Sequence, residues 1–134
     1  MIPAIRIRID FTDHVNLGPG KIALLEAIKS TGSISDAARS LGMSYRRAWL
    51  LVNSLKQGFS EPVTVSATGG KGGGGARVTP FGSSLIKQFR LLEREIARLS
   101  AQRLTMFVPL VNVKAPRLEG TGRKQLAKRI LPRP

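Results

Sequence analysis

Apolar and polar positions alternate near the start of the chain and follow a helical period in four later stretches. Residues 5–11 alternate isoleucine or phenylalanine with charged side chains, and this period of two predicts a half-buried strand at a sheet edge. Residues 21–30 instead place leucine and isoleucine on one stripe, which predicts a first helix after the break at residues 18–20. Gly32 stands where a left-handed residue would end this helix.

The stretch SISDAARSLGMSYRRAWLLVNSL predicts two short helices joined by a sharp turn. Ser33 or Ser35 can cap the first of the pair, and Gly42 is suited to the left-handed conformation that the turn requires. Ser44 can cap the second, which we expect to end near Gly58. Such a pair is typical of a DNA-binding helix-turn-helix, although an ordinary helical hairpin with a solvated basic face would give the same pattern.

The second helix of this pair has two different faces. Its buried face is expected to consist of Ala48, Leu51, Val52 and Leu55. The residues suited to a DNA groove are Ser44, Tyr45, Arg46, Arg47 and Asn53. An arginine in the first turn of such a helix can bind guanine through two hydrogen bonds or contact a phosphate. Trp49 could stack on a sugar or a base, but its spacing from Val52 and Leu55 favours a place in the core.

A glycine-rich loop at residues 69–75 lies between short strands that we predict at residues 63–65 and 77–78. At this position the loop can act as the wing of a winged helix, because glycines let the backbone approach phosphates and basic side chains supply charge. The candidate DNA contacts of the wing are Lys71, Gly72, Gly73 and Arg77. A loop without any contact is the alternative, whereas a nucleotide-binding loop is disfavoured because Gly72, and not Ser or Thr, follows Lys71.

Thr79 and Pro80 predict the start of a long helix that extends to about Arg103, or roughly 35 Å at the usual rise per residue. Apolar residues recur along it at alternating spacings of four and three, as in a coiled-coil seam: Leu85, Phe89, Leu92, Ile96 and Leu99. A stripe of this length exceeds what so small a domain can bury, so we predict that the helix pairs with its copy in a homodimer. Packing of the stripe within the domain is the alternative.

From Thr105 the pattern weakens, and TMFVPLVNVKAP could form a strand or an extended arm. The remainder is basic and rich in Gly and Pro, which predicts a mobile end. The chain thus divides into a domain for DNA binding and dimerisation at residues 1–104 and a basic, flexible tail at residues 105–134. Seven basic residues of the tail could reach further phosphates: Lys114, Arg117, Arg123, Lys124, Lys128, Arg129 and Arg133.

Composition and charge narrow the choice of partners. The 134 residues suffice for one domain, and 22 Lys and Arg against 8 Asp and Glu give a formal net charge of +14. Such an excess attracts nucleic acid or an anionic membrane. No apolar segment is long enough to cross a bilayer and the N-terminus does not resemble a secretory signal, so we expect a cytoplasmic protein without a membrane partner.

The sequence lacks the patterns of catalytic and metal-binding sites. It has no cysteine, which excludes zinc fingers and thiol chemistry, and its one histidine, His14, lies in an expected loop. Paired carboxylates, a metal-ligand cluster and a nucleophile elbow are also not found. We therefore expect neither an enzyme nor a bound cofactor or metal.

The helix-turn-helix stretch followed by ATGGKGGGGARVTPFG resembles the N-terminal DNA-binding domain of the ModE family, the molybdate-responsive transcriptional regulators. The likeness covers roughly residues 17–103. It is carried by Ser44-Tyr45, Ala48-Trp49, the four consecutive glycines within residues 67–76 and the Thr79-x-x-Gly82 helix start. The resemblance implies a winged helix related to LysR-type regulators and a dimer formed by the long helix.

Full-length members of that family carry two further small β-barrel domains that bind molybdate. About thirty residues follow the long helix and cannot form them, so we expect a stand-alone DNA-binding version without molybdate binding. The sequence as a whole predicts a mainly α winged helix-turn-helix with a small β component, acting as a homodimeric, sequence-specific transcriptional regulator on double-stranded DNA. Two alternatives stay open: a sequence-neutral nucleoid- or RNA-associated protein, and a regulator that senses an oxyanion.

Overall fold

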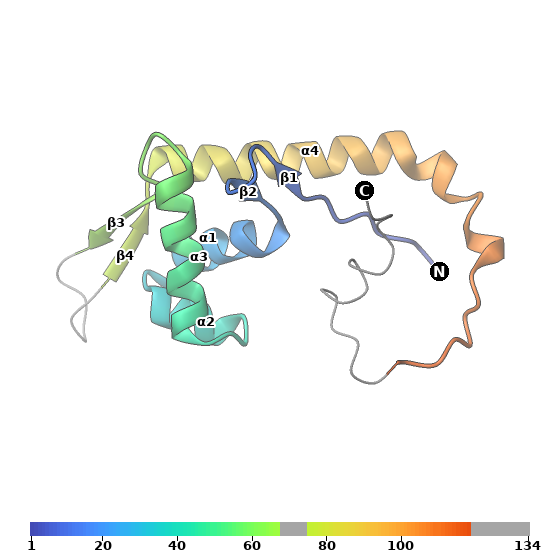
Figure 1. The fold of residues 1–134 in the computed structure, drawn as a ribbon, viewed down its shortest axis with the longest axis horizontal. Coiled ribbons are helices and arrows are strands. Elements are labelled where there is room, and N and C mark those ends of the chain that lie inside the picture. The colour runs from blue at the N-terminus through green and yellow to red at the C-terminus, as the bar shows by residue number, and fades with distance from the viewer. Residues whose placement is uncertain (68–74, 119–134) are drawn as a thin grey trace.

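The computed structural model describes residues 1–67 and 75–118 of the chain. In chain order its elements are β1 (Ile9–Asp10), β2 (Asn16–Leu17), α1 (Pro19–Thr31), α2 (Ile34–Ser40), α3 (Tyr45–Gly58), β3 (Thr64–Ala67), β4 (Gly75–Val78), α4 (Pro80–Leu104) and the 3₁₀ helix η1 (Val108–Leu110). Figure 1 shows α4 along one side of the molecule, with α1 to α3 beside its N-terminal half. This is the predicted mainly α winged helix-turn-helix with a small β component and a long C-terminal helix.

Short-range interactions fix both ends of α2. Ser33, and not Ser35, caps this helix: its Oγ accepts a hydrogen bond from the backbone N–H of Asp36 at 2.9 Å. Gly32 before α2 and Gly42 after it have φ angles of 79° and 66°, in the left-handed region that glycine adopts without steric penalty. The two turns that the sequence predicts around the second helix are therefore confirmed.

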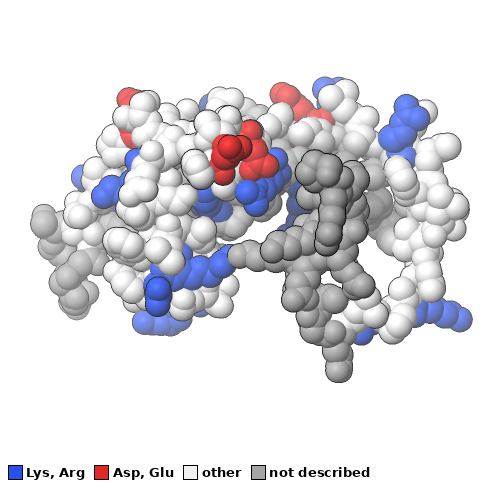
Figure 2. Space-filling model, viewed as in Figure 1, with Lys and Arg blue, Asp and Glu red and all other residues white. Residues whose placement is uncertain are grey.

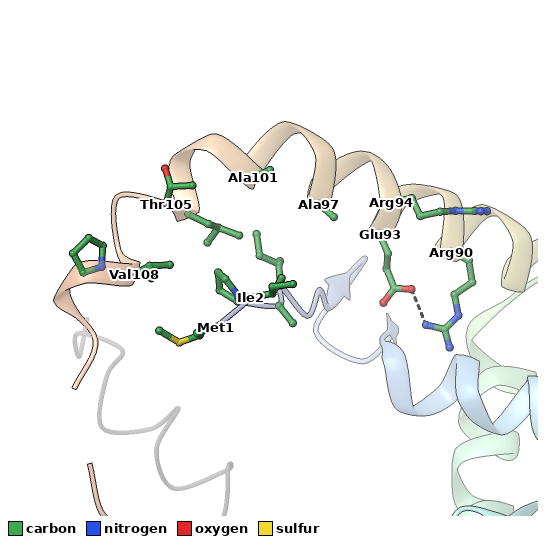
Figure 3. A pocket seen from close by; sticks show the side chains of 14 residues that line it. Met1, Ile2, Arg90, Glu93, Arg94, Ala97, Ala101, Thr105 and Val108 are labelled. Atoms are coloured by element: carbon green, nitrogen blue, oxygen red, sulfur yellow. Dashed lines mark hydrogen bonds and ion pairs between the residues drawn. The ribbon is translucent and has the colours of Figure 1, made fainter. Parts of the chain in front are cut away.

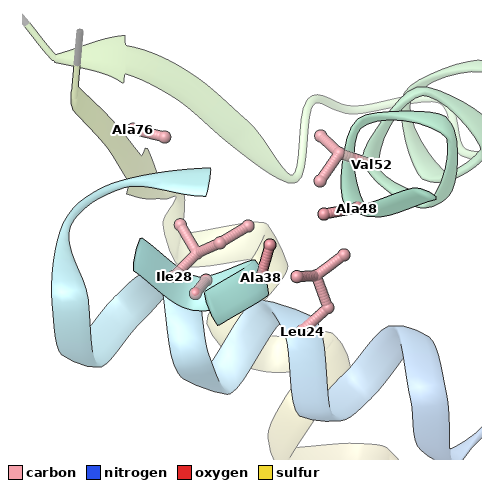
Figure 4. Close-up of a cluster of buried hydrophobic side chains, with 7 residues drawn as sticks. Leu24, Ile28, Ala38, Ala48, Val52 and Ala76 are labelled. Carbon is pink, nitrogen blue, oxygen red and sulfur yellow. The ribbon is translucent and has the colours of Figure 1, made fainter. Parts of the chain in front are cut away.

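One apolar cluster lies where α1, α2 and α3 meet strand β4 (Figure 4). Its buried members are Leu24, Ile28, Ala37, Ala38, Ala48, Val52 and Ala76. Because Ala38 and Ala48 are small, α2 and α3 approach each other closely and hold a fixed angle. Leu51, predicted on the buried face of α3, is only half-buried and packs against the edge of this cluster.

A second cluster attaches the N-terminal half of α4 to the rest of the domain. Its buried members are Leu17, Ile22, Leu25, Leu55, Val63 and Phe89. In the first turn of α4, a Cβ on Gly82 would stand 2.4 Å from the carbonyl oxygen of Val63. No side chain fits there. Gly82, which belongs to the predicted helix start, therefore allows α4 to approach the chain before β3 this closely.

The first strand is shorter than the sequence predicts. Of residues 5–11 only Ile9–Asp10 pair with another strand, which is Asn16–Leu17. Within residues 1–67 and 75–118, no second strand pairs with the residues before Ile9; Met1 to Ile5 instead line a groove together with α4. Alternation alone thus marks the half-buried positions but does not supply the partner strand that a sheet requires.

The stretch after α4 does not form the strand that was one of its two predicted alternatives. In place of a strand the chain forms the 3₁₀ helix η1, which contains Pro109, and a proline offers no N–H for strand pairing. Residues 111–118 are exposed and contain neither helix nor strand, and the predicted tail beyond them lies outside the described residues. Within the part of the chain that is described, no helix combines the length and the apolar character needed to span a membrane.

Candidate nucleic-acid interface

One side of α3 faces solvent although it carries three large apolar side chains. Tyr45, Trp49 and Leu50 are 57%, 48% and 51% exposed, and the neighbouring Arg46 and Arg47 are exposed as well. The helical period places Arg46 and Leu50 in one row and Tyr45 and Trp49 in the row beside it. The opposite side of α3 packs onto α1 and α2. The helix therefore presents arginines and aromatic rings together on a surface that the fold itself does not cover.

The prediction that Trp49 lies in the core is wrong. The buried face of α3 is centred on Ala48, Val52 and Leu55, each at most 4% exposed. Trp49 follows Ala48 directly, and one residue is a rotation of about 100° around a helix, so its side chain leaves the buried face. The close approach of α2 also leaves no space for an indole between the two helices. The spacing of the apolar residues predicted helix α3 correctly, but it did not show that Trp49 lies outside the buried face of that helix.

Ser44 orders the start of α3. Its Oγ accepts a hydrogen bond from the backbone N–H of Arg47 at 3.1 Å, which confirms the predicted cap. The same hydroxyl can still donate its proton, and a phosphate oxygen is a suitable acceptor. Ser44 thus holds the first turn, with Tyr45 and Arg46, in place, and its predicted DNA contact stays a prediction.

Asn53 lies farther along α3, where the helix meets the loop between β1 and β2. It is half-buried and lines a small hollow of about 340 Å³. The other residues around this hollow are His14, Val15, Leu50, Ser54, Gln57 and Gly58. Sequence reasoning missed Leu50 and Gln57, although they follow Arg46 by four and eleven residues and so share its face of the helix.

A buried lysine, which sequence reasoning also missed, anchors the back of α3. Lys21 is 8% exposed, and its Nζ donates hydrogen bonds of 3.0 Å to the carbonyl oxygen and Oδ1 of Asn16 and to Oγ of Ser54. Burial, and secondarily the positive charge of Arg8, lowers the pKa of Lys21. Its place four residues before Leu25 on the apolar stripe of α1 was the available signal. The bonds tie β2 and α1 to α3.

The wing is described only at its base. Strands β3 and β4 pair antiparallel from Thr64 opposite Val78 to Ala67 opposite Gly75. The backbone N–H of Ala76 donates a hydrogen bond of 2.9 Å to the carbonyl oxygen of Gly32 at the end of α1, which fixes the hairpin beside the helix-turn-helix. Arg77 is exposed on β4. The other predicted wing contacts, Lys71, Gly72 and Gly73, lie outside the described residues.

The charge on this side of the molecule is predominantly positive. Figure 2 shows Lys and Arg side chains gathered over the end formed by α2 and the first turn of α3, with acidic side chains nearer α4. Arg39, Arg46 and Arg47 are exposed there. Asp36 on α2 forms an ion pair of 3.3 Å with Arg39, which offsets part of the negative charge of Asp36. The exposed face of α3 thus lies within a field that attracts anions.

The apolar stripe of α4 changes character along the helix. Phe89 is 2% exposed and belongs to the core of its own chain, and Leu85 packs against the same cluster. Leu92 and Ile96 are half-buried, and Leu99 is 73% exposed. Leu92, Ile96 and Leu99, the three C-terminal members of the predicted seam, therefore offer surface to a second molecule.

A groove of about 1130 Å³ lies between the C-terminal half of α4 and the N-terminal segment. Figure 3 shows Met1 and Ile2 on one side of it and Ala97 and Ala101 of α4 on the other. At its inner end Arg90 bonds Glu26 of α1 and, at 2.7 Å, Glu93. The hydrogen bond with Glu26 has the larger effect and that with Glu93 the smaller, and both raise the pKa of Arg90. The network fixes α4 to α1 at the point where α4 leaves the domain.

No family model matches the chain, but several curated proteins do. It is 46% identical over 83 residues to the molybdenum-pterin-binding protein MopB of Rhodobacter capsulatus, covering 62% of this chain and 31% of that protein. It is 48% identical over 75 residues to the DNA-binding transcriptional dual regulator ModE of Escherichia coli K12, and 47% over 74 residues to the transcriptional regulator ModE of Yersinia pestis, in each case 55% of this chain and 28% of the relative. This chain is a relative of the ModE regulators.

The resemblance to the N-terminal domain of ModE that the sequence motifs indicate is thus confirmed. The chain spans about a third of the length of the ModE and Mop proteins that it matches. Among residues 1–67 and 75–118, no group of three or more His, Cys, Asp or Glu side chains could hold a metal ion.

Proposed function

We propose that the protein is a transcriptional regulator of the cytoplasm that binds double-stranded DNA as a homodimer and reads sequence with α3. The observation that carries the proposal is the division of α3 into a buried row and an exposed row with Arg46 and Arg47 in its first turn. A relative of 48% identity is named a DNA-binding transcriptional dual regulator, which supports the same function.

The geometry suggests how the contacts are shared. With α3 in the major groove, Arg46 or Arg47 would bind guanine O6 and N7, and α2 would cross the phosphate backbone. Ser44, Tyr45 and Asn53 would add contacts around them. Arg77, with Lys71 and the wing glycines, would hold the flanking backbone.

Two chains would pair through the C-terminal half of α4. The apolar residues that remain for this contact are Leu92, Ile96 and Leu99, whereas Leu85 and Phe89 serve the core of each chain. A two-fold dimer would place its two α3 helices in successive major grooves, about 34 Å apart. The relation to LysR-type regulators that the resemblance implies belongs to the same proposal.

Selection of bound duplexes from a randomised pool by the purified protein tests the function. We expect enrichment of an inverted repeat whose half-sites are centred about one helical turn apart. The variant Arg46→Ala should enrich a weaker or altered half-site. A pool that stays random after selection, with easy displacement by unrelated DNA or RNA, would favour the sequence-neutral alternative.

We also propose that this chain does not bind molybdate, although two of its relatives are named molybdenum-pterin-binding proteins. Titration calorimetry with molybdate, tungstate and sulfate should give no binding heat. Saturable heat with molybdate and tungstate but not with sulfate would instead support an oxyanion-sensing regulator.

A further inference from the structure

The exposed indole of Trp49 is not explained by the packing of the chain. It stands on α3 beside the exposed Leu50, on the side of the helix that carries Arg46. Neither side chain belongs to the two buried clusters of the domain. Large apolar side chains that lie side by side on a helix and in solvent mark a surface that meets a partner.

The surroundings of the pair identify the kind of partner. Helix α3 contains three basic residues, Arg46, Arg47 and Lys56, and no acidic one. A second copy that docked face to face on this helix would bring arginines against arginines, which is unfavourable. A polyanion brings the opposite charge, so the occupant that fits both features is nucleic acid with apolar groups in reach of α3.

The major groove of a DNA duplex offers one such group. Bases in the groove present hydrogen-bond donors and acceptors, and thymine alone adds a methyl group at C5. The bases remain stacked in a duplex, so an indole on a groove-reading helix meets their edges and not their faces. Trp49 lies in the row next to Arg46, and Leu50 lies one turn beyond Arg46. The two side chains would therefore meet base edges next to the base that Arg46 contacts.

We propose that Trp49 and Leu50 form a surface that recognises thymine methyl groups, so that the half-site contains thymine beside the guanine read by arginine. The proposal rests on the proposed function of α3 as the DNA-reading helix. It assigns to Trp49 the reading of a base and not a structural role, and it makes specificity depend on an apolar contact as well as on the arginines.

The test replaces single thymines of the selected duplex by deoxyuridine, which removes the methyl group and keeps base pairing. For the unmodified protein we expect a loss of about fourfold in affinity at each contacted thymine, as for one methyl group removed from water. The loss should disappear in Trp49→Ala for the thymine that Trp49 touches. Arg47→Ala serves as the matched control, because it should weaken both duplexes and leave their ratio unchanged.

Each outcome decides the proposal. Equal affinity of the unmodified protein for all thymine and deoxyuridine duplexes would overturn it while leaving sequence-specific binding intact. A Trp49→Ala variant that weakens both duplexes equally would show a sugar or phosphate contact and would overturn it as well. Loss of all sequence preference in the unmodified protein would instead remove the proposed function, and with it this inference. The deoxyuridine measurements need no variant, so they stand even if Trp49→Ala folds poorly.

Discussion

Two of the exposed apolar surfaces in the described part of the chain differ in their surroundings, one on α3 and one on the C-terminal half of α4. The first consists of Tyr45, Trp49 and Leu50 among arginines, without an acidic residue on its helix. The second includes Ile96 and Leu99, and its helix carries both signs of charge nearby, as in the sequence EREIARLSAQR. Exposure of apolar side chains is common to both surfaces. The charged residues around the two surfaces differ, and this difference favours a different partner for each.

Charge, more than hydrophobicity, separates a nucleic-acid surface from a protein surface. An apolar patch within positive charge suits a polyanion, and its binding is expected to depend on salt. An apolar patch with balanced charge suits a copy of itself, and burial of its area is little affected by salt. The two surfaces should therefore respond differently to the same change of conditions.

The largest expected difference is in the response to salt. Raising the salt concentration from about 50 to 200 mM should weaken DNA binding by roughly a thousandfold or more, because phosphate contacts release counterions. Dimerisation through α4 should change little over the same range. Fluorescence anisotropy of labelled DNA and sedimentation of the protein alone give the two values. A flat response of DNA binding, or an equally steep response of the dimer, would show that charge does not distinguish the two surfaces.

A charge placed in the α4 surface should have the next largest effect. Leu99→Glu would bury an unpaired carboxylate in each subunit and should weaken the dimer by about 3 kcal/mol or more. The melting temperature of the single chain should stay nearly constant, since Leu99 is 73% exposed. Arg98→Gln, which changes the net charge by the same amount at the neighbouring exposed position, is the control. A dimer of Leu99→Glu as tight as the unmodified one would place the contact elsewhere.

Removing one arginine of the α3 surface should have a smaller effect that depends on sequence. Arg46→Ala or Arg47→Ala should weaken binding to the selected duplex by about 1–3 kcal/mol and binding to random DNA much less. Arg98→Ala removes the same charge from α4 and provides the comparison. If each of the two arginine variants loses the same amount of affinity for selected and for random DNA, these residues contact phosphates and not bases.

The smallest expected effect concerns the cap of α3. Ser44→Ala should lower the free energy of unfolding by about 1 kcal/mol, because the N–H of Arg47 loses its acceptor. Ser44→Asp should restore the cap and the stability, since aspartate is an equally good cap. Its negative charge should nevertheless weaken DNA binding, because it stands at the start of the reading helix. Denaturant unfolding and DNA titration of both variants separate the two roles. If Ser44→Asp binds DNA with full affinity, Ser44 does not lie near a phosphate in the complex.

Local features of the sequence were sufficient for most of the fold. Ser33, Ser44 and Thr79 cap helices, and Gly32 and Gly42 take left-handed turns, because these properties depend on neighbours within four residues. The helical period predicted the bounds of the helices to within a few residues for the same reason.

Local features could not predict which other segment of the chain packs over a given residue. Trp49 and Phe89 both stand on apolar stripes, yet the first is exposed and the second is buried in the cluster that joins α4 to the domain. The difference arises from the alanines that bring α2 onto α3 and from Gly82, which brings α4 onto the domain. The role of Lys21 likewise depends on Ser54, 33 residues away. Contacts between distant segments, and not local period, decide these cases.

DNA is expected to cover the exposed face of α3, and the single tryptophan of the chain reports on that face. The most direct measurement is acrylamide quenching of Trp49 fluorescence, with and without saturating amounts of the selected duplex at low salt. We predict that the duplex lowers the quenching constant clearly, and that a scrambled duplex at the same degree of saturation lowers it less. A quenching constant that does not change when the selected duplex is bound would show that DNA binds away from the exposed face of α3.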